Sequence, residues 1–251
     1  MGTTIVKEIT ISKGININKN ETTFRTHIHD RYAFLLLKRV FDVTLSLLVL
    51  LFIFSWLFPI LFILIKIESR GPIFFVQKRV GFLGRSFSCL KFRTMYINAD
   101  AHTRQATEND PRITRIGRFL RDSNLDEIPQ FLNVLAGHMS IVGPRPHMHK
   151  DSDNFSRVVE AYKFRSLMKP GITGLAQVKG YRGPARDFDT IFRRYQWDAF
   201  YIRNANFWMD LRIVHKTALQ TFSNILSKFV VFEDNTTPLV KEWIEPKNIL
   251  N

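Results

Sequence analysis

Residues 43–65 read VTLSLLVLLFIFSWLFPILFILI, an uncharged run interrupted only by Pro59. A helix needs roughly 20 apolar residues to cross a bilayer core of about 30 Å, so the run is long enough for a span. The sequence therefore predicts that the protein is embedded in a membrane. The residues around the run restrict how it is embedded.

Basic residues flank the run on both sides. A spanning helix would leave one of these two basic clusters on the non-cytoplasmic side, which the positive-inside bias disfavours. Pro59 removes a backbone donor and clashes with the preceding turn, so it kinks or breaks a helix. We therefore expect a re-entrant helix that breaks at Ser55 and Pro59 and keeps both ends in the cytoplasm; a kinked single span is the alternative. The flanking basic residues are Arg31, Lys38, Arg39, Lys66, Arg70, Lys78, Arg79 and Arg85.

The composition indicates an anionic partner. The 251-residue chain carries 36 Lys and Arg against 22 Asp and Glu, which gives a net charge of +14. Such an excess suits nucleic acid, a phospholipid surface or phosphorylated substrates, and the apolar run favours the last two. Cys89 is the only cysteine, which excludes an internal disulfide and suits a reducing cytoplasm.

The chain after the apolar run mixes strand and helix patterns. Residues 73–95 are expected to form a hairpin with a glycine turn. Apolar side chains with helical spacing predict a helix that begins near Asp126, because Pro129 is tolerated only in a first turn. A short strand is expected over residues 139–142, and residues 169–174 form a turn-rich connection.

Two further helical patterns, at residues 187–203 and 206–222, interleave aromatic side chains with arginine. Such amphipathic helices suit the headgroup layer, where they lie in the interface plane. Packing of the same aromatics in the core is the alternative.

Asp126 and Glu127 stand at the predicted helix start, where unpaired backbone N–H groups and the helix dipole keep carboxylates ionised. Ser123 precedes Asp126 by the spacing of a capping box, so plain capping is the alternative to a chemical role. Arginines nearby exceed the acids, and free guanidinium groups bind phosphate well, although helical rotation prevents all of them from facing one ligand. An ionised carboxylate among phosphate-binding groups is a competent nucleophile. These arginines are Arg112, Arg115, Arg118 and Arg121.

With these residues the chain resembles the small monotopic phosphoglycosyltransferases. This bacterial sugar transferase family starts polysaccharide and glycan assembly on a polyprenyl phosphate carrier. Motifs in the family's order carry the resemblance over residues 38–222. They are Lys38-Arg39-Val40-Phe41-Asp42, Gly71-Pro72-Ile73-Phe74-Phe75-Val76-Gln77, Lys91-Phe92-Arg93-Thr94-Met95, Pro111-Arg112-Ile113-Thr114-Arg115-Ile116-Gly117, Asp126-Glu127-Ile128-Pro129-Gln130, Ser140-Ile141-Val142-Gly143-Pro144-Arg145-Pro146 and Lys169-Pro170-Gly171-Ile172-Thr173-Gly174.

The resemblance implies a two-step reaction. Asp126 would attack the β-phosphorus of a UDP-sugar and expel UMP, and undecaprenyl phosphate would then take the sugar phosphate from the aspartyl intermediate. Glu127, together with Asp126, would hold Mg²⁺, a hard cation that binds carboxylate and phosphate oxygens. Asp198 matches a further family acid by position alone, and a surface role is its alternative. The residues matched to phosphate and substrate binding are Lys91, Arg93, Arg112, Arg121, Arg145 and Asp198.

The resemblance also implies an α/β (α+β) fold: a mostly helical monotopic enzyme with a re-entrant N-terminal helix, a small β-hairpin and interfacial amphipathic helices. It would lie at the cytoplasmic face of the bacterial inner membrane, with UDP-sugar, undecaprenyl phosphate and inner-membrane lipids as partners; homodimerisation stays open. The expected layout is a polar extension over 1–37, the re-entrant helix over 38–70, a cytosolic catalytic domain over 71–222 and a tail over 223–251.

Two local features bear on details. Phe58 precedes Pro59 where the better understood family members carry serine, and Gly180-Tyr181-Arg182-Gly183 resembles a segment of relatives that handle glucose or galactose. The runner-up is a membrane-tethered basic module that binds nucleic acid or anionic lipid without catalysis, and a soluble glycosyltransferase with a simple tail comes third. The runner-up gives no reason for the acidic pair, and no nucleic-acid-binding signature is present, so nucleic acid is not an expected partner.

Overall fold

The computed structural model describes residues 32–102, 106–107, 110–183 and 187–234. Over these residues the chain is mostly helical with two two-stranded sheets, so the predicted α+β class is confirmed in this coarse form. Most of the expected N-terminal extension, with Arg31, and the end of the expected tail lie outside the described residues. The described parts of both segments, residues 32–37 and 223–234, are helical.

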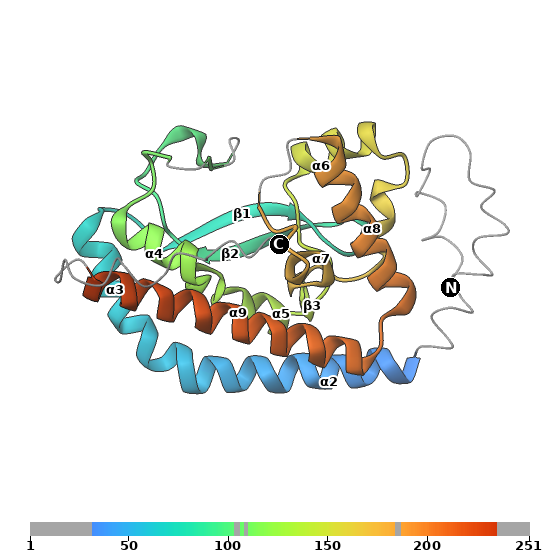
Figure 1. Cartoon of the computed structure of the whole chain (residues 1–251), viewed down its shortest axis with the longest axis horizontal. Helices are drawn as coiled ribbons and strands as arrows, with labels where there is room; N and C mark the ends of the chain where they lie inside the picture. The colour runs from blue at the N-terminus through green and yellow to red at the C-terminus, as the bar shows by residue number, and fades with distance from the viewer. Residues whose placement is uncertain (1–31, 103–105, 108–109, 184–186, 235–251) are drawn as a thin grey trace, which may run out of the picture.

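The apolar run lies in one long helical stretch, Tyr32–Glu68, with a mean hydropathy of 2.9 in its most apolar window. Among the described residues it is the one helix long and apolar enough to cross a membrane, by length and composition alone. Its parts are α2 (Tyr32–Val49), a π-helical turn (Leu50–Phe54) and α3 (Ser55–Glu68). Figure 1 shows α2 along the lower edge of the molecule and α3 rising from its end.

The irregular part of this helix is the π-helical turn, which lies just before the predicted break at Ser55 and Pro59. Pro59 is inside α3, and the chain stays helical through it. A proline ring crowds the carbonyl four residues earlier, at Ser55, and a widened turn just upstream, Leu50–Phe54, is one way to relieve that clash. The Ser55 hydroxyl donates to the Leu51 carbonyl at 2.5 Å. The predicted break at Ser55 and Pro59 is therefore corrected to a π-helical turn that ends where Ser55 begins α3.

Buried polar contacts hold α2 to the rest of the molecule. Lys38 Nζ lies 2.7 Å from Asp210 Oδ2, on α9 (Phe207–Asp234). Asp42 Oδ1 accepts a 2.9 Å hydrogen bond from the backbone N–H of Ile141. Arg39 donates to the carbonyls of Val134 and Leu135, at the end of α5 (Gln130–Leu135), at 2.7 and 3.0 Å. We call Lys38, Arg39, Asp42 and Asp210 the polar latch.

Phenylalanine rings hold α3 instead. Phe58 stacks on Phe74 of the hairpin with 5.7 Å between ring centroids, and Phe74 stacks on Phe92 at 5.6 Å. Phe54 completes the group, 5.0 Å from Phe58. We call these four residues the aromatic clamp. They give Phe58, the residue that stands where relatives carry serine, a packing role.

The hairpin prediction is confirmed. Strand β1 (Phe74–Val80) pairs antiparallel with β2 (Ser86–Phe92), with Phe74 opposite Phe92. The predicted strand at 139–142 is β3 (Ser140–Val142), and it pairs in parallel with β4 (Gly171–Thr173). The segment expected to be only a connection thus contains a strand. A Cβ on Gly171 would lie 2.1 Å from the backbone N of Gly143, so the close approach of these chains requires glycine.

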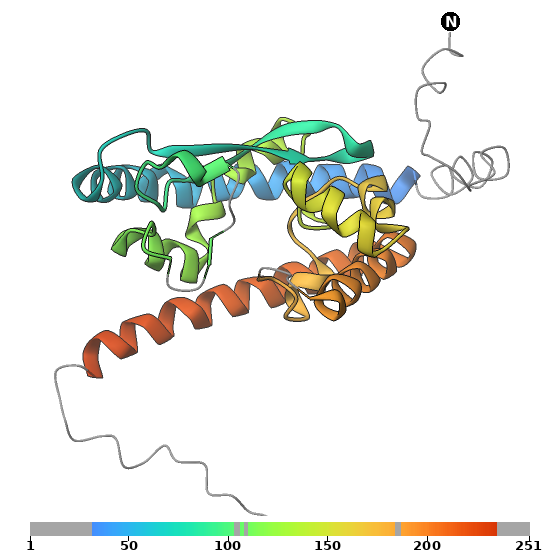
Figure 2. The same cartoon turned by 90° about the horizontal axis from the view of Figure 1, so that it is seen from above.

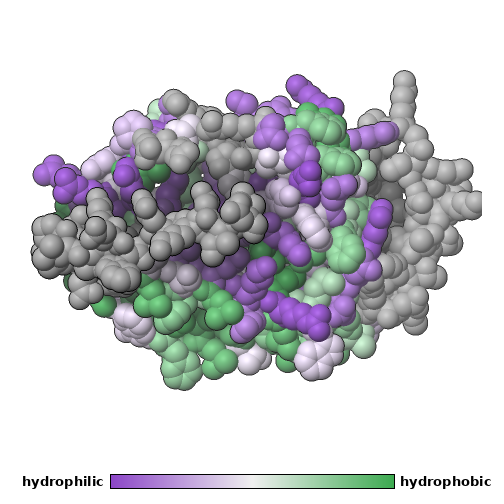
Figure 3. Space-filling model, viewed as in Figure 1, coloured by the Kyte–Doolittle hydropathy of each residue, from purple (hydrophilic) through white to green (hydrophobic). Residues whose placement is uncertain are grey.

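Shorter helices pack between the hairpin and α9, and Figure 2 shows the hairpin lying along α2 while α9 diverges from it. The two predicted helices after residue 187 are confirmed as α8 and α9. Their aromatics divide, because Tyr201 is buried whereas Phe200 and Trp208 are exposed. Apolar side chains gather along the lower edge of the molecule (Figure 3). The remaining helices are α4 (Arg115–Ser123), α5 (Gln130–Leu135), α6 (His149–Val158), α7 (Leu175–Val178) and α8 (Phe188–Asn204).

Candidate active site

The acidic pair lies in a tight turn between two helices. After α4, Asn124 adopts a left-handed conformation with φ of 60°, and residues 125–127 form a short 3₁₀ turn that leads into α5. The Ser123 hydroxyl donates back to the Phe119 carbonyl at 2.7 Å. Ser123 is the last residue of α4, and the turn that follows has no side-chain cap hydrogen bond, so the predicted capping box is wrong. Capping by Ser123 does not explain why Asp126 and Glu127 stand here.

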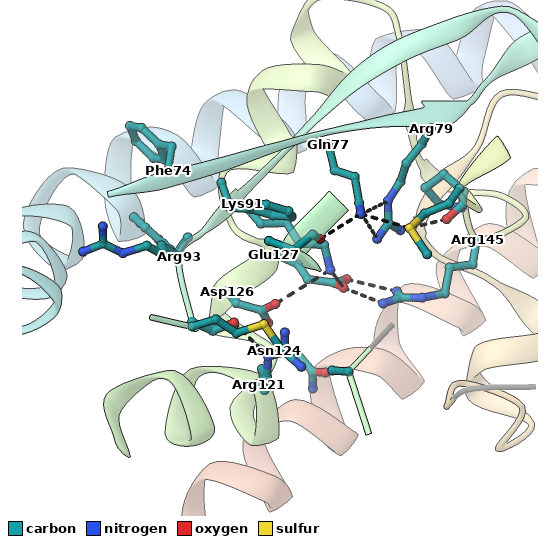
Figure 4. A pocket seen from close by; sticks show the side chains of 18 of the residues that line it. Phe74, Gln77, Arg79, Lys91, Arg93, Arg121, Asn124, Asp126, Glu127 and Arg145 are labelled. Carbon is teal, nitrogen blue, oxygen red and sulfur yellow. Dashed lines mark hydrogen bonds and ion pairs between the residues drawn. The ribbon is translucent and has the colours of Figure 1, made fainter. Parts of the chain in front are cut away.

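Glu127 is held between two cations. Its Oε1 lies 2.6 Å from Lys91 Nζ and 2.7 Å from Arg145 Nη2, and its Oε2 accepts a 3.2 Å bond from Arg145 Nη1. Lys91 comes from β2, and Arg145 comes from the turn after β3. Figure 4 shows the three side chains converging, with both cations directed at the carboxylate. Three separate segments are thus fixed by one buried anion.

Asp126 is bound more loosely. Its Oδ2 lies 3.7 Å from Lys91 Nζ, too far for a direct hydrogen bond, and its carboxylate lines the same cleft as Glu127. The residue is 7% exposed. Asp126 therefore has a weaker charge partner than Glu127 although the two are adjacent in sequence.

The two carboxyl groups have opposite pKa shifts. Burial raises the pKa of Asp126, the Glu127 charge adds to the rise, and Lys91 opposes it. Burial alone would also raise the pKa of Glu127, but Arg145 and Lys91 outweigh it and hold that pKa well below its usual value. Glu127 is thus a fixed anion, whereas Asp126 is the more basic carboxylate of the pair. Pairs whose environments push their pKa values apart are typical of divided catalytic roles.

A cleft of about 580 Å³ contains the pair. Its lining includes Phe74 and Phe92 of the aromatic clamp and the arginines Arg79 and Arg194. In Figure 4, Phe74 and Arg93 lie on one side of the acidic pair, whereas Arg79 and Arg145 lie on the other. The cleft thus combines aromatic rings packed against α3 with cationic side chains around the acidic pair. The described residues with charged side chains that line it are Arg79, Lys91, Arg93, Arg121, Asp126, Glu127, Arg145, Asp151, Arg182 and Arg194.

Three of the predicted phosphate-binding cations meet at the pair. Lys91 and Arg145 contact Glu127 directly. Arg121 lines the cleft and its Nε donates to Thr94 Oγ1 at 2.8 Å. It is the only member of the cluster Arg112, Arg115, Arg118 and Arg121 among the described lining residues, in agreement with the expectation that helical rotation separates them.

Two other predicted cations make different contacts. Arg112 forms an ion pair with Asp110, with Nη2 2.7 Å from Oδ2. It is not among the described lining residues, but its Nη1 donates at 3.4 Å to Asn98 Oδ1, and Asn98 lines the cleft. Arg93 reaches the cleft wall, but its guanidinium donates to the carbonyls of Ser69 and Arg70 at 2.6 and 3.0 Å. It therefore satisfies carbonyls that follow α3. These contacts connect Arg93 to the end of the long apolar helix.

Asp198 is not a surface residue, since it is 2% exposed. Its Oδ2 accepts from Arg165 at 2.7 Å, and it is not among the described residues that line the cleft. The alternative of an exposed acid is wrong, and the expected direct contact with substrate has no support in this geometry.

Sequence reasoning missed several lining residues. Arg79 was counted only as a flanking charge, and Arg194 only as one of several arginines between aromatics. His147 was not singled out. Burial, reinforced by Arg165 and Arg194, holds its pKa well below the usual value, so the imidazole is neutral among guanidinium groups. The sequence signal for Arg79 and His147 was their position beside recognised motifs. Arg194 had only the alternation of arginine and aromatic residues in its helix.

The donor set for a metal ion is small. Among the residues that the structure describes, no three His, Cys, Asp or Glu side chains gather as a metal cluster. Asp126 and Glu127 supply two adjacent carboxylates in the cleft. Mg²⁺ typically binds to one or two carboxylates, substrate phosphates and water, so this pair fits that ion.

Comparison with known proteins identifies related sequences. The model of the bacterial sugar transferase family matches residues 33–224. UDP-glucose:undecaprenyl-phosphate glucose-1-phosphate transferase of Escherichia coli (strain K12) is 43% identical over 190 residues, covering 75% of this chain and 41% of the relative. The protein of that name from Xanthomonas campestris pv. campestris is 49% identical over 158 residues, covering 62% and 33%.

A shorter relative matches almost from end to end. An exopolysaccharide production protein of Rhizobium leguminosarum bv. phaseoli is 42% identical over 190 residues, which cover 74% of this chain and 94% of the relative. The match spans less than half the length of the first two relatives and nearly all of this one.

Proposed function

The chain belongs to the bacterial sugar transferase family, and we propose that it transfers a hexose 1-phosphate from a UDP-sugar to undecaprenyl phosphate and releases UMP. This would be the first step in assembling an exopolysaccharide, capsule, O-antigen or other glycan. The names of two relatives give glucose as the sugar. The observation that carries the proposal is the acidic pair, one carboxylate locked between cations and the other facing the same cleft with a weaker partner.

Asp126 is the nucleophile in this mechanism. Its carboxylate oxygen forms a bond to the β-phosphorus while the bond from that phosphorus to the bridging oxygen breaks, and the electron pair leaves with UMP. An oxygen of undecaprenyl phosphate then attacks the same phosphorus, and Asp126 is released as carboxylate. Poor solvation makes a buried carboxylate more basic, which suits nucleophilic attack once it is ionised.

The cationic lining stabilises the phosphate charge. Lys91 lies between the two carboxylates, 2.6 Å from Glu127 and 3.7 Å from Asp126. Its ammonium group can therefore stabilise negative charge on Asp126 before the attack and on the phosphoryl oxygens during it. Arg121 and Arg145 lie around the same point and supply planar donors for phosphate oxygens. Preorganised cations of this kind lower the barrier to phosphoryl transfer mainly by electrostatics.

Asp126 and Glu127 are the residues that would hold Mg²⁺. When bound, the ion would neutralise charge on the donor's phosphates. Glu127 is already paired with Lys91 and Arg145, so a cation there would share or replace those contacts.

We also propose that the apolar helix is re-entrant and monotopic, at the cytoplasmic face of the inner membrane. What supports this is that both ends of the helix contact the same soluble body. Lys38 near its start pairs with Asp210, and Glu68 at its end accepts from the backbone N–H groups of Arg115 and Ile116 at 2.6 and 2.9 Å. A helix that crossed the bilayer core of about 30 Å would place its two ends on opposite sides, so the two ends could not both contact one soluble body.

The apolar lower edge of the molecule suits the same placement. The large exposed apolar side chains of α2 and α9 include Leu48 and Phe222. They would enter the headgroup and acyl layer. In this arrangement the predicted membrane helix over 38–70 and the predicted catalytic domain over 71–222 pack against each other and both lie at the membrane surface.

Topology can be tested by cysteine labelling from each side of the membrane. Tyr32→Cys and Arg70→Cys place thiols at exposed positions at the two ends, while the native Cys89 is 1% exposed and labels little. The re-entrant helix predicts labelling of both from the cytoplasmic side. Labelling from opposite sides would establish a span.

The activity test is UMP release. The purified protein would be incubated with Mg²⁺, undecaprenyl phosphate and a panel of UDP-sugars, beside Asp126→Asn and the control Asp189→Asn, an exposed acid on α8. The proposal expects release by the wild type and the control but not by Asp126→Asn. Full activity of Asp126→Asn, or no release with any donor, would reject it; the second result favours a binding module.

A further inference from the structure

In the turn that carries Arg145, each of four consecutive backbone carbonyls accepts a hydrogen bond from another part of the protein. Arg145 stands between two prolines, which lack the N–H groups that would otherwise anchor the backbone. Side chains and neighbouring strands supply donors instead. The carbonyl oxygens of Pro144, Arg145, Pro146 and His147 accept from Gly171 N, Arg165 Nη2, Arg79 Nη1 and Val80 N at 3.0, 2.9, 2.8 and 2.9 Å, respectively.

The bond to the Arg145 carbonyl comes from an arginine that is itself held rigidly. Arg165 is 8% exposed, and its Nε and Nη2 donate to Asp198 Oδ2 at 3.1 and 2.7 Å. Its guanidinium also lies over the ring of Tyr162, 5.1 Å from the centroid. These contacts fix the plane of the guanidinium, so the Nη2 that bonds Asp198 also meets the Arg145 carbonyl.

The buried charge of Arg165 explains why an acidic residue stands at position 198. An unpaired guanidinium in this interior would be costly, and a carboxylate beside it compensates the charge. Asn in its place keeps the shape and a weaker acceptor but removes the compensation. Asp198 is not among the described residues that line the cleft, and its hydrogen bonds toward the site run through Arg165.

We propose that Asp198 and Arg165 are positioning residues for Arg145, which aim its guanidinium fork at Glu127 and the phosphate site. The chain of contacts runs from the Asp198 carboxylate through Arg165 to the Arg145 carbonyl, and from the Arg145 side chain to Glu127 at 2.7 and 3.2 Å. The proposal rests on the proposed function, because it assigns both residues to the same reaction. It gives Asp198 a role without direct contact with substrate.

The first test is a double-mutant cycle on kcat/KM for UMP release. Arg165→Lys keeps the positive charge but loses the fork that bonds Asp198 and Arg145 together. It should lower kcat/KM about 10- to 100-fold, since small misplacement of a catalytic group costs this much. In an Arg145→Ala background the same change should have little further effect, because the side chain that it positions is gone. Independent, multiplying effects would overturn the proposal.

Asp198→Asn completes this set. It should lower kcat/KM in the same direction as Arg165→Lys, and the two changes together should cost no more than the larger one alone. The control is Asp110→Asn, which breaks the ion pair between a buried carboxylate and Arg112, also 2.7 Å long. Its effect should multiply with that of Arg145→Ala.

A second readout does not depend on activity. Hydrogen exchange of peptides that cover residues 143–148 should become faster in Arg165→Lys and Asp198→Asn and stay unchanged in Asp110→Asn. Unchanged exchange in the first two would overturn the proposal even if activity falls. If the wild type releases no UMP, the proposed function fails by itself, and the exchange data still decide whether Arg165 holds the turn.

Discussion

The two halves of the long apolar helix pack on the protein through different contacts, apart from the Glu68 carboxylate that anchors the end of α3. Helix α2 uses the polar latch, in which Lys38 and Asp42 are 5% and 3% exposed and each has a partner in the soluble part. Helix α3 uses the aromatic clamp, in which Phe58 stacks on the hairpin rings. Between them lies the π-helical turn.

The difference teaches how such a helix is oriented. Hydrogen bonds and ion pairs are directional, so the polar latch fixes the rotation of α2 and turns its few polar groups toward the rest of the protein. Stacked rings accept a range of positions, so the aromatic clamp can hold α3 beyond an irregular turn. The clamp also includes Phe74 and Phe92 of the cleft lining, and thus connects the long apolar helix to the site.

The largest effect is expected from breaking the polar latch. Asp210→Ala would leave Lys38 as a buried charge without its partner, at a cost of about 3–5 kcal/mol in the free energy of unfolding. Chemical denaturation in detergent measures this loss. Asp189→Ala, which breaks an exposed pair with Arg193, should leave stability nearly unchanged. Equal effects of the two substitutions would show that the latch is not a stabilising contact.

A smaller effect is expected in the aromatic clamp. Phe92→Leu keeps an apolar side chain at a position that is 1% exposed but removes the stacking with Phe74 and Phe58. The expected loss is about 1–2 kcal/mol, because neighbouring rings can repack. The same denaturation assay checks it. A loss as large as that of Asp210→Ala would mean that the clamp is as specific as the latch.

The smallest effect is expected at the proline itself. Pro59→Ala restores a backbone donor within α3, and the contacts at both helix ends remain. We expect a change of less than about 1 kcal/mol in the free energy of unfolding and the same cysteine-labelling pattern as in the wild type. A switch of Arg70→Cys labelling to the other side in this background would show that Pro59, rather than the latch and the clamp, dictates the topology.

Sequence patterns predicted the elements that follow from local chemistry. The hairpin follows from apolar strand residues around glycines, and the two late helices follow from apolar periodicity. The family motifs predicted that Lys91 and Arg145 would share a site with the acidic pair, and the structure brings them to Glu127.

Other features depend on backbone or tertiary geometry that no single-sequence pattern encodes. Strand β4 has three residues in a glycine-rich segment, too few for a period to appear. Ser123 matched a capping box, yet it ends α4 and its hydroxyl donates to the Phe119 carbonyl of that helix. The left-handed Asn124 then turns the chain away. The link from Asp198 through Arg165 joins residues 33 positions apart, and only packing brings them into contact.

The central claim is that Asp126 forms a covalent bond to the sugar phosphate, and intact-protein mass spectrometry tests it most directly. The protein would be incubated with Mg²⁺ and UDP-glucose in the absence of undecaprenyl phosphate. The account predicts a mass increase of one hexose phosphate, located on the peptide with Asp126, lost when undecaprenyl phosphate is added and absent from Asp126→Asn. UMP release by wild type with lipid acceptor but no such adduct, or an adduct on Asp126→Asn, would contradict it.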